Sequence, residues 1–231
     1  MIPAPSYEYI DKLLNQEWID IGIHSAPGIP KRGNMVGFIF FDQNFKRPPL
    51  ADFIENVDLL NENSGQYIHF FLPGVSMYGS NEGDISKEMG TLKGTTLYHN
   101  ARAFDSFREE FENRLENWEY NYGVDIILVD IIEESGVRKI DFESAIFFKV
   151  EEFINLRLVE RTLDLLGKII KYRRDYGILT AKDLQNKMKQ AFGINWFKAL
   201  ILSLFPKAVG DLARVQAVLA GGGAVRQIDS H

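Results

Sequence analysis

The chain has 231 residues, 45% hydrophobic and 25% charged, which is the composition of a folded globular protein with one large domain or a domain and an appendage. It contains no cysteine, which excludes disulfides, thiolate nucleophiles and cysteine-based zinc or iron–sulfur sites and favours a reducing compartment. Its net charge of −6 is uneven: residues 1–150 hold 13 Lys and Arg against 24 Asp and Glu, net −11, whereas residues 151–231 hold 13 against 8, net +5. The two parts therefore present different surfaces, to one another or to different partners.

Two segments of the sequence bear on where in the cell the protein is located. Residues 1–6 lack the basic and apolar segments of a secretory signal. Residues 194–205 are the longest apolar stretch near the other end, and they are fewer than the roughly 20 apolar residues that cross a bilayer. We therefore expect a cytoplasmic protein with no membrane span.

In the first part of the chain, dense apolar runs typical of buried strands alternate with apolar spacings of three and four, typical of helices. Ser6 is placed to cap a helix over residues 7–14. The next predicted elements are a strand over 35–41, a helix over 50–62 and a strand over 67–72. Residues 76–96 have no sustained periodicity, so we expect an irregular loop there, either a functional lid or a disordered insertion.

The middle of the chain carries the strongest patterns. Aromatic residues from Phe104 to Trp118 recur at steps of three and four and predict a helix over 101–118 whose aromatic stripe packs in a core. Residues 124–132, with the sequence VDIILVDII, are apolar at nearly every position and predict a strand buried on both faces. A further strand is expected over 144–148.

The last third is predicted to be helical. One apolar face indicates a single helix from residue 151 to about 174, with Lys and Arg crowding its last turns. Thr180 is placed to cap a helix over 181–192, and helices over 196–205 and 207–220 follow. We therefore expect an α/β domain over 1–175 and a C-terminal helical subdomain with a flexible end over 176–231.

These elements define the expected fold. The class is α/β, with a mixed, partly parallel sheet of four or five strands flanked by helices and followed by a C-terminal helical region. Over residues 35–174, the order of strand, helix, strand, loop, helix, strand, strand, helix resembles that of the thioredoxin-like fold. The family's redox activity is not expected, because the chain has no Cys-x-x-Cys motif.

Polar side chains near strand ends are the first candidates for ligand binding, because ligands of open α/β sheets favour the carboxyl ends of strands. Asp42 and Asn44 follow one predicted strand, and Asp130 interrupts the apolar run of another near its carboxyl end. The alternative is that they are ordinary polar strand termini and turns.

A second candidate cluster lies at the start of the aromatic helix. His99 and Arg102 stand there, and early helical N–H groups together with Arg102 would suit an anion. The alternative is that the cluster is structural, with Asn100 capping the helix.

Motifs for specific chemistry are lacking. There is no Walker-type loop and no Gly-x-Gly-x-x-Gly after a strand, and the glycines at 221–223 follow a helix instead. Neither a Gly-x-Ser-x-Gly nucleophile elbow nor a metal-binding His spacing is present, so we expect no cofactor and no metal. Asp130, Glu143 and Lys149 loosely resemble the acids and lysine of restriction-endonuclease-like enzymes, but the Glu-x-Lys order of that family is absent.

The C-terminal helices offer a candidate partner surface. They carry more apolar side chains than three short helices easily hide among themselves, and these would pack on the sheet domain, on a second subunit or on a partner. The candidate partner-binding residues are Trp196, Phe197, Leu200, Ile201 and Leu204.

Three hypotheses about function follow. The leading one is a non-catalytic cytoplasmic α/β binding module whose C-terminal helices mediate self-association or contact with a protein partner. The second is an enzyme or sensor that binds a small molecule or nucleotide at strand C-terminal ends. The third is nucleic-acid binding through the basic C-terminal helices, with Lys182, Lys187 and Lys189 on one of them.

Overall fold

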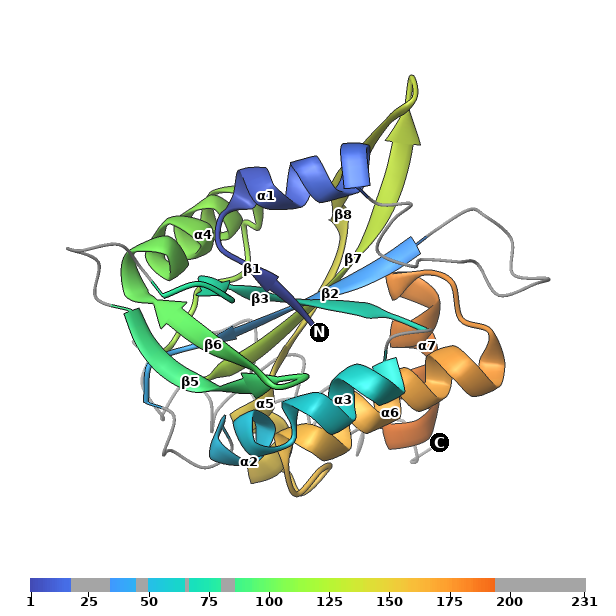
Figure 1. Ribbon diagram of the computed structural model, residues 1–231. Helices are drawn as coiled ribbons and strands as arrows, with labels where there is room; N and C mark the ends of the chain where they lie inside the picture. The colour runs from blue at the N-terminus through green and yellow to red at the C-terminus, as the bar shows by residue number, and fades with distance from the viewer. Residues whose placement is uncertain (18–33, 45–49, 65–66, 80–85, 194–231) are drawn as a thin grey trace, which may run out of the picture.

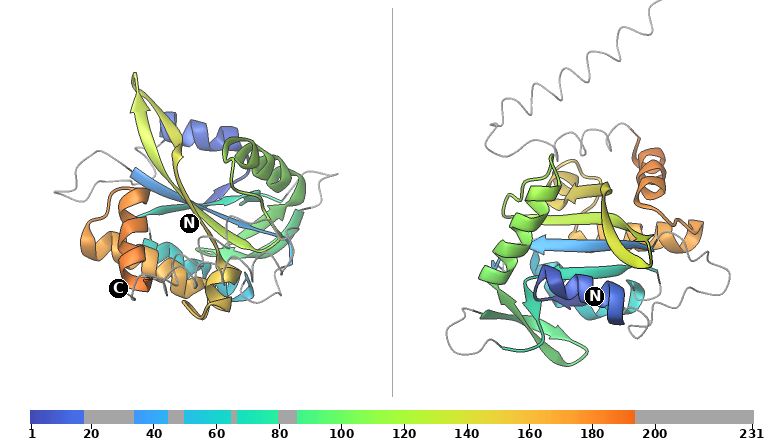
Figure 2. Two further views of the ribbon diagram at one scale, coloured as in Figure 1. Left: turned by 180° about the vertical axis from the view of Figure 1, so that it is seen from behind. Right: turned by 90° about the horizontal axis from the view of Figure 1, so that it is seen from above.

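The computed structural model describes residues 1–17, 34–44, 50–64, 67–79 and 86–193. Among these residues, a mixed five-stranded sheet lies between two layers of helices (Figures 1 and 2). Its strands are β1 (Ile2–Ala4), β2 (Asn34–Phe41), β3 (His69–Pro73), β7 (Val124–Glu134) and β8 (Val137–Lys149). The predicted α/β class with a mixed, partly parallel sheet is confirmed.

The helices form one layer on each side of the sheet. The helix α1 (Tyr7–Lys12), which a π-helical turn η1 (Leu13–Glu17) continues, and α4 (Ala101–Arg114) cover one face. The other layer contains α2 (Leu50–Glu55), α3 (Val57–Ser64), α5 (Val150–Asn155), α6 (Thr162–Tyr176) and α7 (Ala181–Phe192). No helix in the described part of the chain is long and apolar enough to span a membrane.

The strand order of the main sheet is β1-β3-β2-β7-β8. The strands β1, β3 and β2 run parallel, whereas β7 runs antiparallel to β2, so that Met35 faces Asp130 and Phe41 faces Val124. The edge strand β8 is antiparallel to β7. The carboxyl ends of β1, β2 and β3 therefore lie at one edge of the sheet, and the carboxyl end of β7 lies at the opposite edge.

Side chains of β7 alternate between the two layers, as the pleat of a strand requires. Ile126 and Leu128 join the core cluster that includes α2, α3 and α6, and Ile127 and Val129 join the cluster that includes α1 and α4. The prediction that this strand is buried on both faces is confirmed from residue 124 to 129. It fails at Ile132, which is 37% exposed where the β7–β8 hairpin projects beyond the helices (Figure 1).

The expectation of an irregular loop over 76–96 is wrong for much of that segment. A second, small sheet with the order β4-β6-β5 contains β4 (Val75–Ser76), β5 (Ser86–Leu92) and β6 (Thr95–Asn100). A register shift between Glu88 and Gly90 breaks the two-residue alternation of β5, which is why its sequence shows no strand pattern. His99 lies just before α4, as expected, and belongs to β6.

The single helix predicted over 151–174 is also wrong, because two helices occupy that stretch. The helix α5 ends at Asn155, and Arg157 adopts a positive φ of 55°. The N-terminus of α6 is then stabilised by Asp164, whose Oδ2 accepts a hydrogen bond from the Arg161 N–H at 3.0 Å. The apolar residues between the two helices preserve helical spacing without forming a helix.

The helix α7 is tied to the body of the protein. Thr180 caps it as predicted, accepting a hydrogen bond from the Asp183 N–H at 3.1 Å. Leu184 and Met188 are fully buried in the same core cluster as α6. The division between residues 1–175 and 176–231 stays a prediction, and the helices expected over 196–205 and 207–220 lie outside the described residues.

Two glycines provide a matched test of the core. A Cβ on Gly37 in β2 would lie 2.4 Å from Cδ1 of Phe70 and 2.9 Å from Cδ2 of Leu128, whereas a Cβ on the exposed Gly167 in α6 meets nothing within 4 Å. We expect Gly37→Ala to lower the free energy of unfolding by about 1–3 kcal/mol through overpacking. Gly167→Ala should raise it by about 0.5–1 kcal/mol, since alanine favours a helix. Urea denaturation measures both, and equal effects of the two substitutions would contradict the packing described for β2.

Candidate functional site

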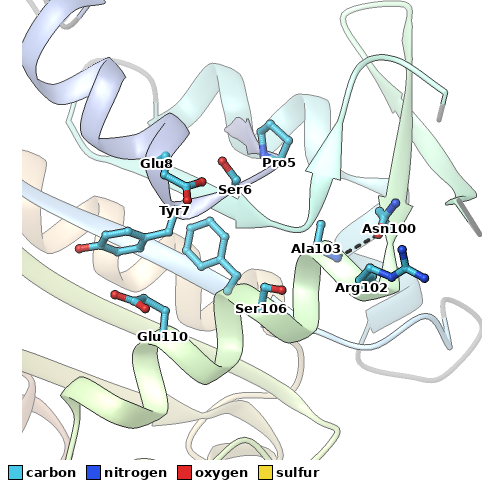
Figure 3. A pocket seen from close by; sticks show the side chains of 10 residues that line it. Pro5, Ser6, Tyr7, Glu8, Asn100, Arg102, Ala103, Ser106 and Glu110 are labelled. Carbon is cyan, nitrogen blue, oxygen red and sulfur yellow. Dashed lines mark hydrogen bonds between the residues drawn. The ribbon is translucent and has the colours of Figure 1, made fainter. Parts of the chain in front are cut away.

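An open pocket of about 530 Å³ lies between the start of α1 and the first three turns of α4, where the carboxyl end of β1 leads into α1 (Figure 3). Its walls combine small, aromatic and charged side chains. The lining residues are Pro5, Ser6, Tyr7, Glu8, Asn100, Arg102, Ala103, Ser106, Phe107 and Glu110.

Gly74 holds the two helix starts side by side. Its N–H donates to the Ala4 carbonyl oxygen at the end of β1, and its own carbonyl accepts from the Asn100 N–H, both at 2.9 Å. Its φ is +74°, and a Cβ there would lie 2.7–2.9 Å from Phe104 Cβ and backbone atoms. The pocket thus depends on a position that only glycine fits well.

Capping side chains define the two helix starts. Ser6 Oγ accepts from the Tyr9 N–H at 3.2 Å, and Asn100 Oδ1 accepts from the Ala103 N–H at 2.9 Å. Both satisfy backbone donors that a helix leaves unpaired in its first turn. The capping alternative for Asn100 is thereby confirmed, and these hydrogen bonds hold the side chains of Ser6 and Asn100 at the pocket.

Opposite charges occupy the two ends of the pocket. Arg102 and Asn100 lie at one end, and Tyr7, Glu8 and Glu110 lie at the other (Figure 3). The carboxylate of Glu110 accepts a 2.8 Å hydrogen bond from Arg114 Nε.

Tyr7 stands at the acidic end. The Arg114 guanidinium lies 4.9 Å from the centre of its ring, and Phe107 contacts it edge-on at 5.9 Å. Burial raises the pKa of Tyr7 to about 12, an effect that Arg114 opposes and that Asp11 and Glu110 reinforce. The phenol is therefore a neutral hydrogen-bonding group throughout the physiological range.

His99 lies behind the pocket rather than in it. Its ring is 1% exposed and is held 5.4 Å from the ring of Phe41 and 5.2 Å from that of Phe104. Burial lowers its pKa to about 4. A neutral ring enclosed by two aromatic rings is a core residue, while its neighbour in the predicted cluster, Arg102, does line the pocket.

Asp42 and Asn44 follow β2 and close a turn. The Asn44 N–H donates to Asp42 Oδ1 at 2.8 Å, and Lys87 Nζ donates to the intervening Gln43 carbonyl at 2.9 Å. Both candidates are at the carboxyl edge of the sheet, as expected, but they do not line the pocket.

Asp130 lies at the opposite edge of the sheet. It pairs with Met35, which precedes Asp42 by seven residues, and seven residues of a strand span about 23 Å. The sequence does not reveal that β7 runs antiparallel to β2, and this direction separates the two acids. Asp42 and Asp130 therefore do not form one site.

The surroundings of Asp130 give it a structural role. Its Oδ1 accepts from the Ala181 N–H in the first turn of α7 at 2.9 Å, and its own N–H donates to Ser144 Oγ at 2.7 Å. Burial raises the pKa of Asp130, the Ala181 hydrogen bond lowers it, and the neighbouring acid Asp141 raises it further. This carboxylate anchors the start of α7 to the sheet.

The remaining predictions concern metals and partners. Among the described residues, no group of three or more His, Asp or Glu side chains could hold a metal ion. The candidate partner-binding residues Trp196, Phe197, Leu200, Ile201 and Leu204 lie outside the described residues. No protein-family model, curated protein or solved structure matches the chain.

Most of the pocket could not be predicted from the sequence. The cluster predicted at the start of the aromatic helix contains Arg102 but not Ser6, Ser106 or Glu110. A usable signal exists on α4, where Ala103, Ser106 and Glu110 place small and polar side chains at helical spacing beside the aromatic stripe. That signal does not identify α1 as the facing helix. The strand β1, which leads into α1 and pairs with β3, has only three residues and therefore shows no strand pattern in the sequence.

The buried His99 predicts acid sensitivity. Because its pKa is lowered from 6.5 to about 4, its contribution to stability is present above pH 6.5 and is lost as the pH falls toward 4, by about 3 kcal/mol in all. His99→Phe should remove this loss, while His69, whose pKa burial also lowers to about 4, continues to contribute in both proteins. Urea unfolding at pH 7 and pH 4.5 measures the difference. An equal loss of stability in wild type and variant would show that His99 is not held neutral.

Proposed function

We propose that this protein works by binding, without catalysis, and that the pocket between α1 and α4 is its ligand site. The observation that carries the proposal is the pocket itself, a concave site of about 530 Å³ at the carboxyl end of the parallel strand β1, with the capping side chains of Ser6 and Asn100 in its lining. Such strand ends are the usual place for ligands in open α/β sheets. The proposal therefore combines two of the hypotheses from the sequence. It takes the binding module from the first, and it takes from the second the position of the ligand site at a strand C-terminal end.

The chemistry of the lining supports binding over catalysis. A serine nucleophile needs a general base within hydrogen-bonding reach. Ser6 Oγ already serves as a helix cap, and the nearby His99 is enclosed between Phe41 and Phe104 with its pKa lowered to about 4. The pocket's polar groups suit recognition of charge and hydrogen bonds in a ligand.

We further propose a thioredoxin-like arrangement for residues 35–174. Its support is that β2 and β3 are parallel and connected through α2 and α3, that the β7–β8 hairpin pairs beside β2, and that helices lie on both faces. Without cysteine, the arrangement would provide a scaffold for binding and no thiol redox chemistry.

Contact with a second copy or a protein partner is the second part of the proposed function, assigned to the apolar side chains from Trp196 to Leu204. Its support is the sequence after α7, together with the net charge of +5 on residues 151–231 against −11 on the rest. Opposite net charges on two parts of one chain favour association between copies. A cytoplasmic location, supported by the absence of cysteine, completes the proposal.

The pocket can be tested by filling it. A library of small polar fragments, screened by amide chemical shifts, should shift Ser6, Arg102 and Ser106. Ser106→Trp should abolish these shifts, because the indole would occupy the pocket, whereas Glu109→Trp, on the same helix but outside the lining, should retain them. Binding that persists in Ser106→Trp, or no fragment that shifts these amides, would contradict the proposed site.

Self-association can be tested in the full chain by size exclusion with light scattering. Replacing Leu200 and Leu204 by Asp should turn an oligomer into a monomer, since charged side chains oppose burial. Leu59→Asp, at a leucine that is 53% exposed on α3, is the control and should leave the mass unchanged. A monomeric wild-type protein would remove the proposed self-association.

A further inference from the structure

We propose that the outer surface of α6 and α7 binds a single-stranded nucleic acid, with lysines on its phosphates and tyrosines against its bases. The lysines are Lys168, Lys171 and Lys187, and the tyrosines are Tyr172 and Tyr176. The two helices contact each other and belong to the layer opposite that of α1 and α4 (Figures 1 and 2). The inference is therefore independent of the ligand that the pocket takes.

The charge of these two helices differs from that of the rest of the chain. Residues 162–193 hold seven Lys and Arg against three Asp, net +4, whereas the other 199 residues hold 19 against 29, net −10. Each of the three acids is already bonded to a neighbouring residue, at a helix start or within the helix. A polyanion is therefore attracted to this surface and repelled by most of the remaining chain.

Two tyrosines of α6 lie on this surface. Tyr172 and Tyr176 are four residues apart on one side of the helix, their ring centres are 5.9 Å apart, and Tyr176 is 57% exposed. From α7, Lys187 places its Nζ 3.9 Å from the centre of the Tyr176 ring. An exposed aromatic ring and a cation from two different helices thus meet at one place.

The other two lysines lie beside these rings on α6. Lys168 is four residues before Tyr172 and therefore on the same side of the helix, and Lys171, the next residue before Tyr172, is exposed. Lys168 Nζ donates to the Leu158 carbonyl at 3.2 Å, and an ammonium group has three N–H donors, so two remain for a phosphate. Cations therefore flank the tyrosines from both helices.

Aromatic rings next to ammonium groups suit a nucleotide, because a ring stacks with a base while a cation binds the adjacent phosphate. Stacking requires that the bases be unpaired, so the surface favours a single strand over a duplex. A membrane fits less well. The apolar sides of both helices, with Ile169 on α6 and Leu184 and Met188 on α7, are buried in the core, so neither helix can insert an apolar face between lipid headgroups.

Fluorescence anisotropy of the full chain with labelled oligothymidylate and oligouridylate of about 20 nucleotides tests the inference and separates DNA from RNA as the source of the strand. Binding should weaken as salt rises, with a slope of log K against log salt of about −2, because three lysines displace counterions from a single strand. A duplex of the same length should bind at least about fivefold more weakly, because its bases cannot stack on the tyrosines.

Two kinds of variant separate the rings from the charges. Tyr176→Leu should weaken binding at least about fivefold and leave the salt slope unchanged, because stacking displaces no counterion. Lys187→Gln should reduce the magnitude of the slope by about 0.7. The control Lys182→Gln removes a charge about 140° around α7 from Lys187 and should leave the slope unchanged. The control Tyr78→Leu, at a tyrosine that is 83% exposed outside these helices, should leave the affinity unchanged.

Three results would overturn the inference. They are no binding of either oligonucleotide at low salt, equal binding of single strand and duplex, and equal binding by wild type and Tyr176→Leu. Tighter binding to polyglutamate than to the oligonucleotides would assign the surface to an acidic protein, and tighter binding to phosphatidylserine vesicles would assign it to a membrane. Either of these would overturn the inference as well.

Discussion

The pairing of β2 with β7 is the constraint on which the rest of the structure depends. These strands form an antiparallel ladder from Asn34 opposite Ile131 to Phe41 opposite Val124, and their side chains are buried on both faces along most of that length. A sheet centre that is apolar on both sides requires a helical layer on each. The same ladder sets the direction of β7, and it thereby places Asp42 at one edge of the sheet and Asp130 at the other.

Positions at the two edges have different roles as a result. At the carboxyl edge of β1 and β3, Gly74 bonds both to Ala4 and to Asn100, which brings the starts of α1 and α4 together and leaves the pocket between them. At the opposite edge, Asp130 uses its carboxylate to hold α7 against the sheet. Charged side chains thus line a pocket at one edge, whereas at the other edge a charged side chain supports the fold.

Much of the architecture could be predicted from the sequence, because dense apolar runs and aromatic spacing report burial directly. The strands β2, β3 and β7, the helix α4 and the caps at Ser6 and Thr180 are of this kind. Elements that owe their form to distant partners could not be predicted. The strand β1 has three residues and gains its structure by pairing with β3, and β5 loses its alternation at the Glu88–Gly90 bulge. The pocket belongs to this second group, since its two walls lie about 100 residues apart in the chain and meet through Gly74.

The central claim is that the pocket between α1 and α4, which we propose as the ligand site, binds small polar molecules at the carboxyl end of β1. A crystal structure of the protein soaked with a fragment that shifts the amides of Ser6, Arg102 and Ser106 tests it most directly. The account predicts density for the fragment between the starts of α1 and α4. Density for the fragment only at a site away from these two helices would contradict the account.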